Sequence, residues 1–250
     1  MRFLSKSLCL LICLSTAACV TPKEARYGVQ DDQLAKVPAR IAVLPCRLWP
    51  QDARYVGLDK TQIGDAEIQA LCQQVDSYVL KGFEGQPYMR GLSPRVVKAL
   101  LEKNPQEAQL SQLDQLWFQT GQTCEACKHP ASYYREAIAL RPDWRTWLSQ
   151  LSRSAKNSDA VLMPMILQLK SQGLDDRGLA YAQRRAAIVL LLIDSNNGSL
   201  IWMGGREGET RRPLAHYQVS PALEAFAPWD ELWGQLFVQD LWREFPGRQN

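Results

Sequence analysis

The chain contains very little histidine, since His129 and His216 are the only two among 250 residues. Histidine is the side chain that most often transfers protons near neutral pH, so acid–base chemistry would fall to carboxylates, whose positions show no catalytic spacing. The sequence also lacks the GxSxG motif of serine hydrolases, the HExxH motif of zinc proteases, the phosphate-binding P-loop and the GxGxxG dinucleotide fingerprint. We therefore expect a protein that is not an enzyme, with no catalytic residue, no metal site and no cofactor.

A strong excess of charge of either sign is also absent. The formal net charge is +3, and without Arg2 and Lys6 near the N-terminus 27 basic residues remain against 26 acidic ones, a difference of +1. Proteins that bind nucleic acid carry strongly basic surfaces. The near balance gives no reason to expect a nucleic-acid partner.

Residues 1–18 have the layout of an exported leader, with a basic start, the apolar stretch Leu8–Leu14 and small residues before Cys19. Small residues followed by a cysteine resemble the lipobox of bacterial lipoproteins, in which that cysteine is lipidated and becomes the first residue. An ordinary cleaved signal, with Cys19 incidental, is the alternative. Val20 is not the aspartate that retains lipoproteins at the inner membrane of enteric bacteria. We therefore expect a membrane anchor in the outer membrane, on its periplasmic face.

The stretch that follows predicts a linker and then one domain. Residues 19–38 are polar, lack periodicity and end in Val37-Pro38, which is typical of a tether between a lipid and a folded body. We expect residues 39–250 to form that body as a single domain.

The strongest structural signal lies in residues 186–205. Two apolar stretches flank Ser195-Asn196-Asn197-Gly198, and Asn and Gly tolerate the positive φ of tight turns, so the pattern predicts a central β-hairpin. Its first arm, Ala186–Ile193, is apolar without alternation, which favours a strand covered on both faces. It is far shorter than the roughly 20 residues that span a bilayer.

Strands and helices alternate around this hairpin. We expect strands at 40–45 and 159–169, the second with an edge or bulge at Pro164, and a loop at 172–178. Helical periodicity predicts a helix at 65–80, a helical insertion over 92–153 and an amphipathic C-terminal helix at 229–245. The order predicts an α/β fold, a mixed β-sheet with helices packed on it.

These blocks resemble a known family in their order along the chain. An opening strand Ile41–Pro45, a second strand from Asp159, an apolar strand ending in Asp194, a turn glycine and then Trp202 are similar to the N-terminal domain of TolB and to envelope lipoproteins of the curli-secretion (CsgG-like) kind. The resemblance implies a non-enzymatic α/β domain that docks on other envelope proteins.

Four cysteines outside the leader and Cys19 are candidates for disulfides. Cys124 and Cys127 form a CxxC pair, and Cys46 and Cys72 could form a second bridge in an oxidising periplasm. A thiol–disulfide protein that uses the CxxC pair is the alternative function, although no thioredoxin-like pattern surrounds it. Sequence alone cannot choose among the three pairings that four cysteines allow.

The C-terminal helix carries an apolar stripe that includes Trp229, Trp233 and Trp242. Packing on the sheet is one interpretation, and a partner-binding surface is the other, because tryptophan is enriched at interfaces. A further alternative is a carrier of hydrophobic ligands with this helix lining its pocket. The function we expect is that of a lipoprotein that serves as an accessory or assembly subunit of an envelope complex, with the membrane and other envelope proteins as partners.

Overall fold

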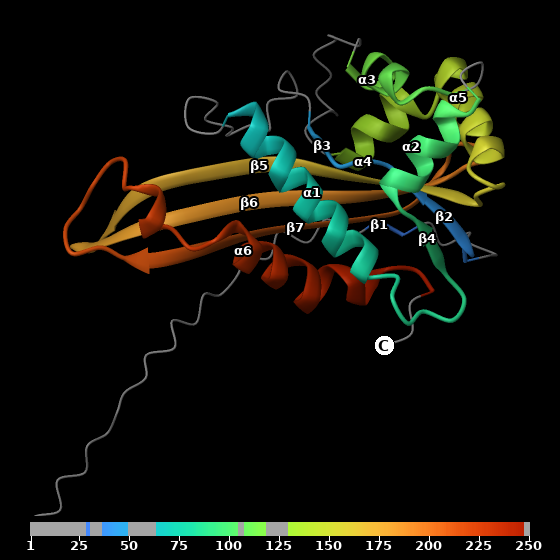
Figure 1. Ribbon diagram of the computed structural model, residues 1–250. Helices are drawn as coiled ribbons and strands as arrows, with labels where there is room; N and C mark the ends of the chain where they lie inside the picture. Colours follow the sequence, from blue (N-terminus) through green and yellow to red (C-terminus); the bar gives the residue numbers. More distant parts are fainter. Residues whose placement is uncertain (1–28, 31–36, 50–63, 105–107, 119–129, 248–250) are drawn as a thin grey trace, which may run out of the picture.

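The computed structural model describes residues 29–30, 37–49, 64–104, 108–118 and 130–247 (Figure 1). Its centre is a mixed sheet of seven strands in the order β1-β7-β6-β5-β2-β4, with β3 also beside β5. The strands are β1 (Val29–Gln30), β2 (Arg40–Val43), β3 (Arg47–Leu48), β4 (Arg90–Leu92), β5 (Ala160–Asp176), β6 (Leu179–Asp194) and β7 (Leu200–Pro213). Pairing is parallel among β4, β2 and β5 and between β3 and β5, and antiparallel from β5 through β6 and β7 to β1. The predicted α/β fold with a mixed sheet is confirmed.

Helices cover both faces of this sheet. They are α1 (Asp65–Lys81), α2 (Pro94–Glu102), α3 (Leu110–Phe118), α4 (Pro130–Tyr133), α5 (Pro142–Ser154) and α6 (Trp229–Leu236), with π-helical turns at Tyr134–Ile138 and Phe237–Leu241. One hydrophobic core packs the helices α2, α3, α4 and α5 against one face of the sheet. A second core packs α1 and α6 against the other face. The predicted helical insertion is therefore the group α2–α5, between β4 and β5. Its first helix starts as its sequence indicates, because Pro94 occupies the first turn and Ser93 Oγ accepts the Val96 N–H at 3.3 Å.

The predicted hairpin is part of a larger antiparallel meander, β5–β6–β7 (Figure 1). β5 has 17 residues, β6 has 16 and β7 has 14. The loop expected at 172–178 is wrong, because β5 continues to Asp176 and turns into β6 through Arg177 and Gly178, both with positive φ. The polar residues that favour a loop in the sequence belong instead to a strand with one face in solvent.

The turn between β6 and β7 has the chemistry expected of it. Asp194 Oδ1 accepts the N–H groups of Asn196 at 2.7 Å and Asn197 at 3.2 Å, and Gly198 has φ of 74°. The side chain thus replaces backbone partners that the tight turn leaves unpaired.

The edge or bulge expected at Pro164 is wrong. β5 is an internal strand, and Pro164 pairs in register with Leu190. The bulge lies between Ile166 and Gln168 instead. β2 pairs with β5 as far as Leu162, and β3 resumes the pairing at Met165. Pro164 faces the gap between them, where its missing N–H removes no ladder bond.

Two residues of the predicted tether form the strand β1. Val29 lies opposite Met203 and Gln30 opposite Trp202, so this part of 19–38 belongs to the sheet. A strand of two residues shows no periodicity, and the sequence therefore contains no signal for it.

The meander has two unlike halves. In the proximal half, which we define as 160–167, 186–194 and 200–206, nearly every side chain is buried, and helices lie on both faces. In the distal half, 168–185 and 207–213, the strands run on beyond α2–α5 (Figure 1). One face of this half is covered by the segment after β7, where Arg184 donates to the Ala227 carbonyl at 2.5 Å and lies 4.8 Å from the Trp229 ring centre.

The other face of the distal half is a ladder of polar side chains. Gln172 Nε2 donates to Gln183 Oε1 at 3.0 Å, Gln183 Nε2 donates to Glu209 Oε2 at 2.8 Å, and Arg211 pairs with Glu209 at 2.8 Å. Arg185 and Glu207 form a further ion pair. Cross-strand neighbours of this kind stabilise a sheet face that is only partly open to water.

Candidate functional site

Two of the predicted cysteines come together where β2 meets α1. The Sγ atoms of Cys46 and Cys72 lie 2.7 Å apart, and both residues are free thiols in the structure. One helical turn after Cys72, Asp76 Oδ1 accepts the Cys46 backbone N–H at 2.8 Å. α1 therefore holds Cys46 through two successive turns, which is a contact that only the packing of the helix on the sheet creates.

The surroundings of these two cysteines disfavour the thiolate form of Cys46. Burial raises the pKa of the Cys46 thiol well above its ordinary value, and the adjacent Cys72 raises it further. Burial also raises the pKa of Asp76 to about 7, although the hydrogen bond from the Cys46 N–H acts in the opposite direction. A thiol with a raised pKa is a poor nucleophile, so the arrangement suits a structural link better than a cycling redox centre.

The remaining predicted cysteines, Cys19, Cys124 and Cys127, lie outside the described residues. The lipidation of Cys19 and the disulfide or redox roles of the CxxC pair stay predictions.

The three tryptophans considered for partner binding lie in the core. Trp229, Trp233 and Trp242 are all buried in the layer that joins α1 and the C-terminal helix to the sheet. The helix packs flush, because a Cβ placed on Gly208 of β7 would lie 2.9 Å from Leu236 Cδ2. In the folded chain these side chains pack in the core. We therefore base neither a partner-binding surface nor a ligand pocket under α6 on these three tryptophans.

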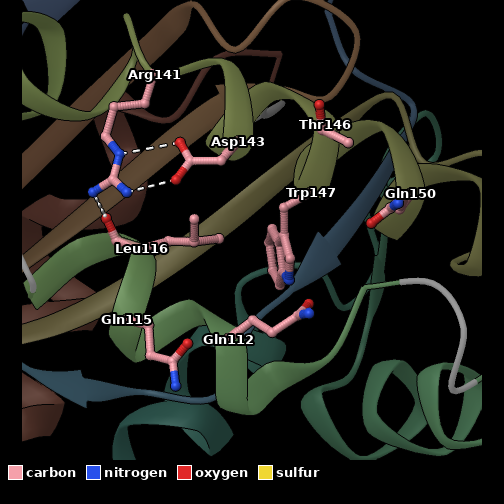
Figure 2. A pocket seen from close by; sticks show the side chains of 8 residues that line it. All are labelled: Gln112, Gln115, Leu116, Arg141, Asp143, Thr146, Trp147 and Gln150. Atoms are coloured by element: carbon pink, nitrogen blue, oxygen red, sulfur yellow. Dashed lines mark hydrogen bonds and ion pairs between the residues drawn. The ribbon is translucent and has the colours of Figure 1, made fainter.

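A polar groove lies between α3 and α5 on the opposite face (Figure 2). Its volume is about 320 Å³, and its lining comprises Gln112, Gln115, Leu116, Arg141, Asp143, Thr146, Trp147 and Gln150. The buried Trp147 lies at the floor, where its Nε1 donates to the Gln109 carbonyl at 3.0 Å. Residues spaced three or four apart on each helix, such as Gln112 and Gln115 on α3, face the same side and line the groove.

The charged groups of the groove neutralise one another. Arg141 donates from Nε and Nη2 to the two carboxylate oxygens of Asp143, at 3.1 and 2.6 Å, and from Nη1 to the Leu116 carbonyl at 2.7 Å. The hydrogen bond from Arg141 lowers the pKa of Asp143 below its ordinary value. This pair joins α3 to the start of α5 and leaves the groove without a strong net charge.

The groove therefore offers neutral hydrogen-bonding groups. Among the described residues, the carboxamides of Gln115 and Gln150 have no hydrogen-bond partner. Each carboxamide can donate and accept, as the peptide group does, and the aromatic floor adds apolar contact. The groove was not expected from the sequence. The spacing of Gln112 and Gln115 on α3 is its only signal there, and nothing in the sequence shows that α3 and α5 pack side by side.

These features define an α/β protein whose mixed sheet carries a helical insertion with a polar groove. The chain matches no protein-family model and no curated protein sequence. Solved structures similar to it include the lipoprotein GNA1162 from Neisseria meningitidis, at 14% identity and a TM-score of 0.35 over 79% of this chain and 92% of that one. The PelC dodecamer from Paraburkholderia phytofirmans matches at 10% identity and a TM-score of 0.36, over 86% of this chain and 95% of that one. The hypothetical protein CT253 from Chlamydia trachomatis matches at 13% identity and a TM-score of 0.38, over 84% of this chain and 94% of that one.

At these identities and scores the likeness assigns the chain to no family and to no function. The resemblance to TolB and to the curli-secretion proteins stays a prediction. Within the described part of the chain, no helix combines the length and the apolar character needed to cross a membrane.

Proposed function

We propose that the chain is a bacterial lipoprotein, held at the periplasmic face of the outer membrane by acyl chains on Cys19, and that it acts as a non-enzymatic accessory or assembly subunit of an envelope complex. The observation that carries this proposal is the leader, in which a basic start, an apolar stretch and small residues end at Cys19. Acyl chains add membrane affinity by burying methylene groups, at roughly 0.8 kcal/mol each.

The groove between α3 and α5 is the surface that we assign to protein binding. The carboxamides of Gln112, Gln115 and Gln150 line it together with Trp147, and its Arg141–Asp143 ion pair is satisfied internally (Figure 2). A polypeptide segment presents the same neutral donors and acceptors, so it can replace the water of this groove without burying an unpaired charge.

Metabolic labelling with a clickable palmitate analogue tests the anchor. We expect the wild-type chain to be labelled in cells, the Cys19→Ala variant to lose the label, and the control Cys13→Ala to keep it. Unchanged labelling of Cys19→Ala would remove the proposed lipid anchor.

Site-specific photocrosslinking in intact cells tests the groove. A photoreactive residue at Gln115 or at Gln150 should give the same protein adduct, whereas one at Lys98 or Glu102 on the exposed side of α2 should not. The adduct formed from position 150 should weaken when Gln115→Ala is added. Adducts of equal yield from α2, or none from either groove position, would contradict binding at the groove.

A further inference from the structure

The free end of the meander carries exposed apolar side chains. Leu179, in the first position of β6, is 60% exposed, and Tyr217, just after β7, is 48% exposed. Both line one hollow of about 230 Å³ at this end of the molecule. Val219 is 71% exposed, and its carbonyl accepts the Gly173 N–H at 3.2 Å, which places it on the edge of β5 near the same end. An exposed apolar cluster of this kind marks an interaction site more often than a random scatter.

The direction of β1 relates this end to the N-terminal chain. β1 runs antiparallel to β7, with Val29 opposite Met203 and Gln30 opposite Trp202, so β1 begins on the side toward the end of β7. Cys19 precedes Val29 by ten residues, and Pro213 follows Met203 by the same number. Ten residues reach at most about 33–36 Å, and a strand of ten residues has about the same length. A chain of the length between Cys19 and β1 is thus just long enough, when extended, to reach the free end of the meander from Val29.

We propose that this free end lies against the lipid bilayer, with Leu179 and Tyr217 inserted at the surface that also holds the acyl chains of Cys19. The inference rests on the lipid anchor of the proposed function. The occupant is a lipid surface rather than a protein, because the anchored chain itself places a bilayer within reach of these side chains. Leucine provides apolar area, and tyrosine is favoured at the membrane–water interface, where its ring is buried and its hydroxyl remains hydrated.

The charges beside the cluster agree with a lipid surface of modest charge. Asp175 and Asp176 are balanced by Arg177, Arg211 and Arg212, which leaves the end close to neutral. Attraction to the bilayer would then come from apolar burial, and we expect it to depend only weakly on salt. The groove between α3 and α5 lies over the proximal half of the meander and would be held away from the bilayer, open to partners in the periplasm.

Lipid photocrosslinking on the full, lipidated chain tests this orientation. The chain is reconstituted into vesicles of phosphatidylethanolamine and phosphatidylglycerol (3:1) that contain phosphatidylethanolamine with a diazirine in its acyl chain, and crosslinked peptides are mapped by mass spectrometry. We expect lipid adducts in 177–181 and 214–223. The variants Leu179→Glu and Tyr217→Glu should each lower the adduct yield at this end by about tenfold, the scale expected when one apolar side chain leaves the bilayer.

Matched controls come from the opposite end of the molecule. Leu140→Glu and Tyr88→Glu replace side chains that are 65% and 69% exposed, and they should leave the lipid adducts unchanged. All four variants should keep the wild-type thermal unfolding midpoint, because each site is on the surface.

Each outcome separates the inference from the proposed function. A wild-type chain that fails to float with the vesicles contradicts the anchor itself. A chain that floats but shows lipid adducts at 84–90 or 137–141, or adducts at the free end that persist in both test variants, overturns the orientation while the anchor stands. A chain that floats but gives no lipid adduct at the free end also overturns it.

Discussion

The proximal and distal halves of the meander consist of the same three strands, and they differ in what covers them. In the proximal half, Ile188 and Val189 are both buried, because α6 and α1 lie on one face and α2–α5 on the other. In the distal half, Arg184 is buried under the segment after β7, whereas Arg185 faces the opposite side and is 38% exposed at its side chain. The change from continuous to alternating burial therefore marks the point at which the helices of one face end.

This difference shows that a long strand need not have one environment. The apolar half supplies the stability of the molecule, whereas the polar half extends the sheet away from the helical insertion. Substitutions in each half can test that division, beginning with the largest expected effect.

Truncation of a buried leucine should separate the two halves most clearly. Leu190→Ala in the proximal half should lower the free energy of unfolding by about 2–5 kcal/mol, because it leaves a cavity between the sheet and the helices. Leu174→Ala, at a half-buried position of the distal half, should lower it by less than about 1 kcal/mol. Urea denaturation of both variants measures this, and equal losses would contradict the division.

Oxidation of Cys46 and Cys72 should strengthen the packing of α1 on the sheet, in the core that covers one face of the proximal half. On export, we expect the two thiols to lose two protons and two electrons to a thiol–disulfide oxidant and to form a disulfide. A link between residues 26 apart should add about 3.5 kcal/mol to the free energy of unfolding on a chain-entropy model. Reductant should lower the stability of the wild type by more than that of Cys72→Ser, which retains only the CxxC pair. Complete alkylation of Cys46 in protein taken from the periplasm would show that no link forms.

The raised pKa of Asp76 should make the contact between α1 and Cys46 sensitive to pH. A carboxyl with a folded-state pKa of about 7, against an ordinary value of 3.8, binds its proton more tightly in the folded state. Its contribution to stability is therefore present at low pH and is lost as pH rises from about 4 through 7. Allowing for its partial exposure, we expect a loss of roughly 2–3 kcal/mol across this window.

The variant Asp76→Asn isolates this effect, because the amide oxygen can still accept the Cys46 N–H while the titration is removed. Urea denaturation at pH 5 and pH 8 should show a smaller difference for the variant than for the wild type. The opposite sign, with the wild type gaining stability relative to Asp76→Asn as pH rises, would refute the assigned pKa shift.

The polar ladder should have the smallest effect. Glu207→Gln removes the ion pair with Arg185 on the distal half and should cost less than about 1 kcal/mol, because Arg185 is 38% exposed, so that water and salt screen the pair, and because the new amide oxygen can still accept from Arg185. The effect should shrink further in 1 M NaCl. A loss as large as that of Leu190→Ala would mean that the distal half is as tightly packed as the proximal one.

Most of the secondary structure could be predicted because its signals are local. Asp194 followed by two asparagines and Gly198 predicts the β6–β7 turn, and its side chain accepts the backbone N–H groups of that turn. Ser93 before Pro94 predicts the start of α2, where the Ser93 hydroxyl caps the helix. The predictions that failed concern position in the sheet.

Pro164 illustrates the failures in the sheet. A proline predicts an edge or a bulge, and its true place opposite the gap between β2 and β3 depends on two short strands that are distant in the sequence. The loop expected at 172–178 failed for a related reason. A mostly polar stretch with two glycines fits either a loop or a strand with one face in water, and only the pairing with β6 decides between them.

The groove could not have been predicted, and the sequence could propose the Cys46–Cys72 contact only as one of the pairings that four cysteines allow. Gln115 and Gln150 belong to different helices, and Cys46 meets Cys72 only because α1 packs across the end of β2. Side chains that meet through packing carry no mark of it in their own segments.

The sequence by itself determined the class of the fold, the central hairpin and the layout of the leader, because apolar periodicity, turn residues and caps act over a few neighbouring positions. Only the tertiary structure decided that the C-terminal tryptophans lie in the core, that two thiols meet, and that one end of the meander is apolar and exposed. Those outcomes depend on which surfaces of distant segments exclude water together, and that is a property of the whole packed chain.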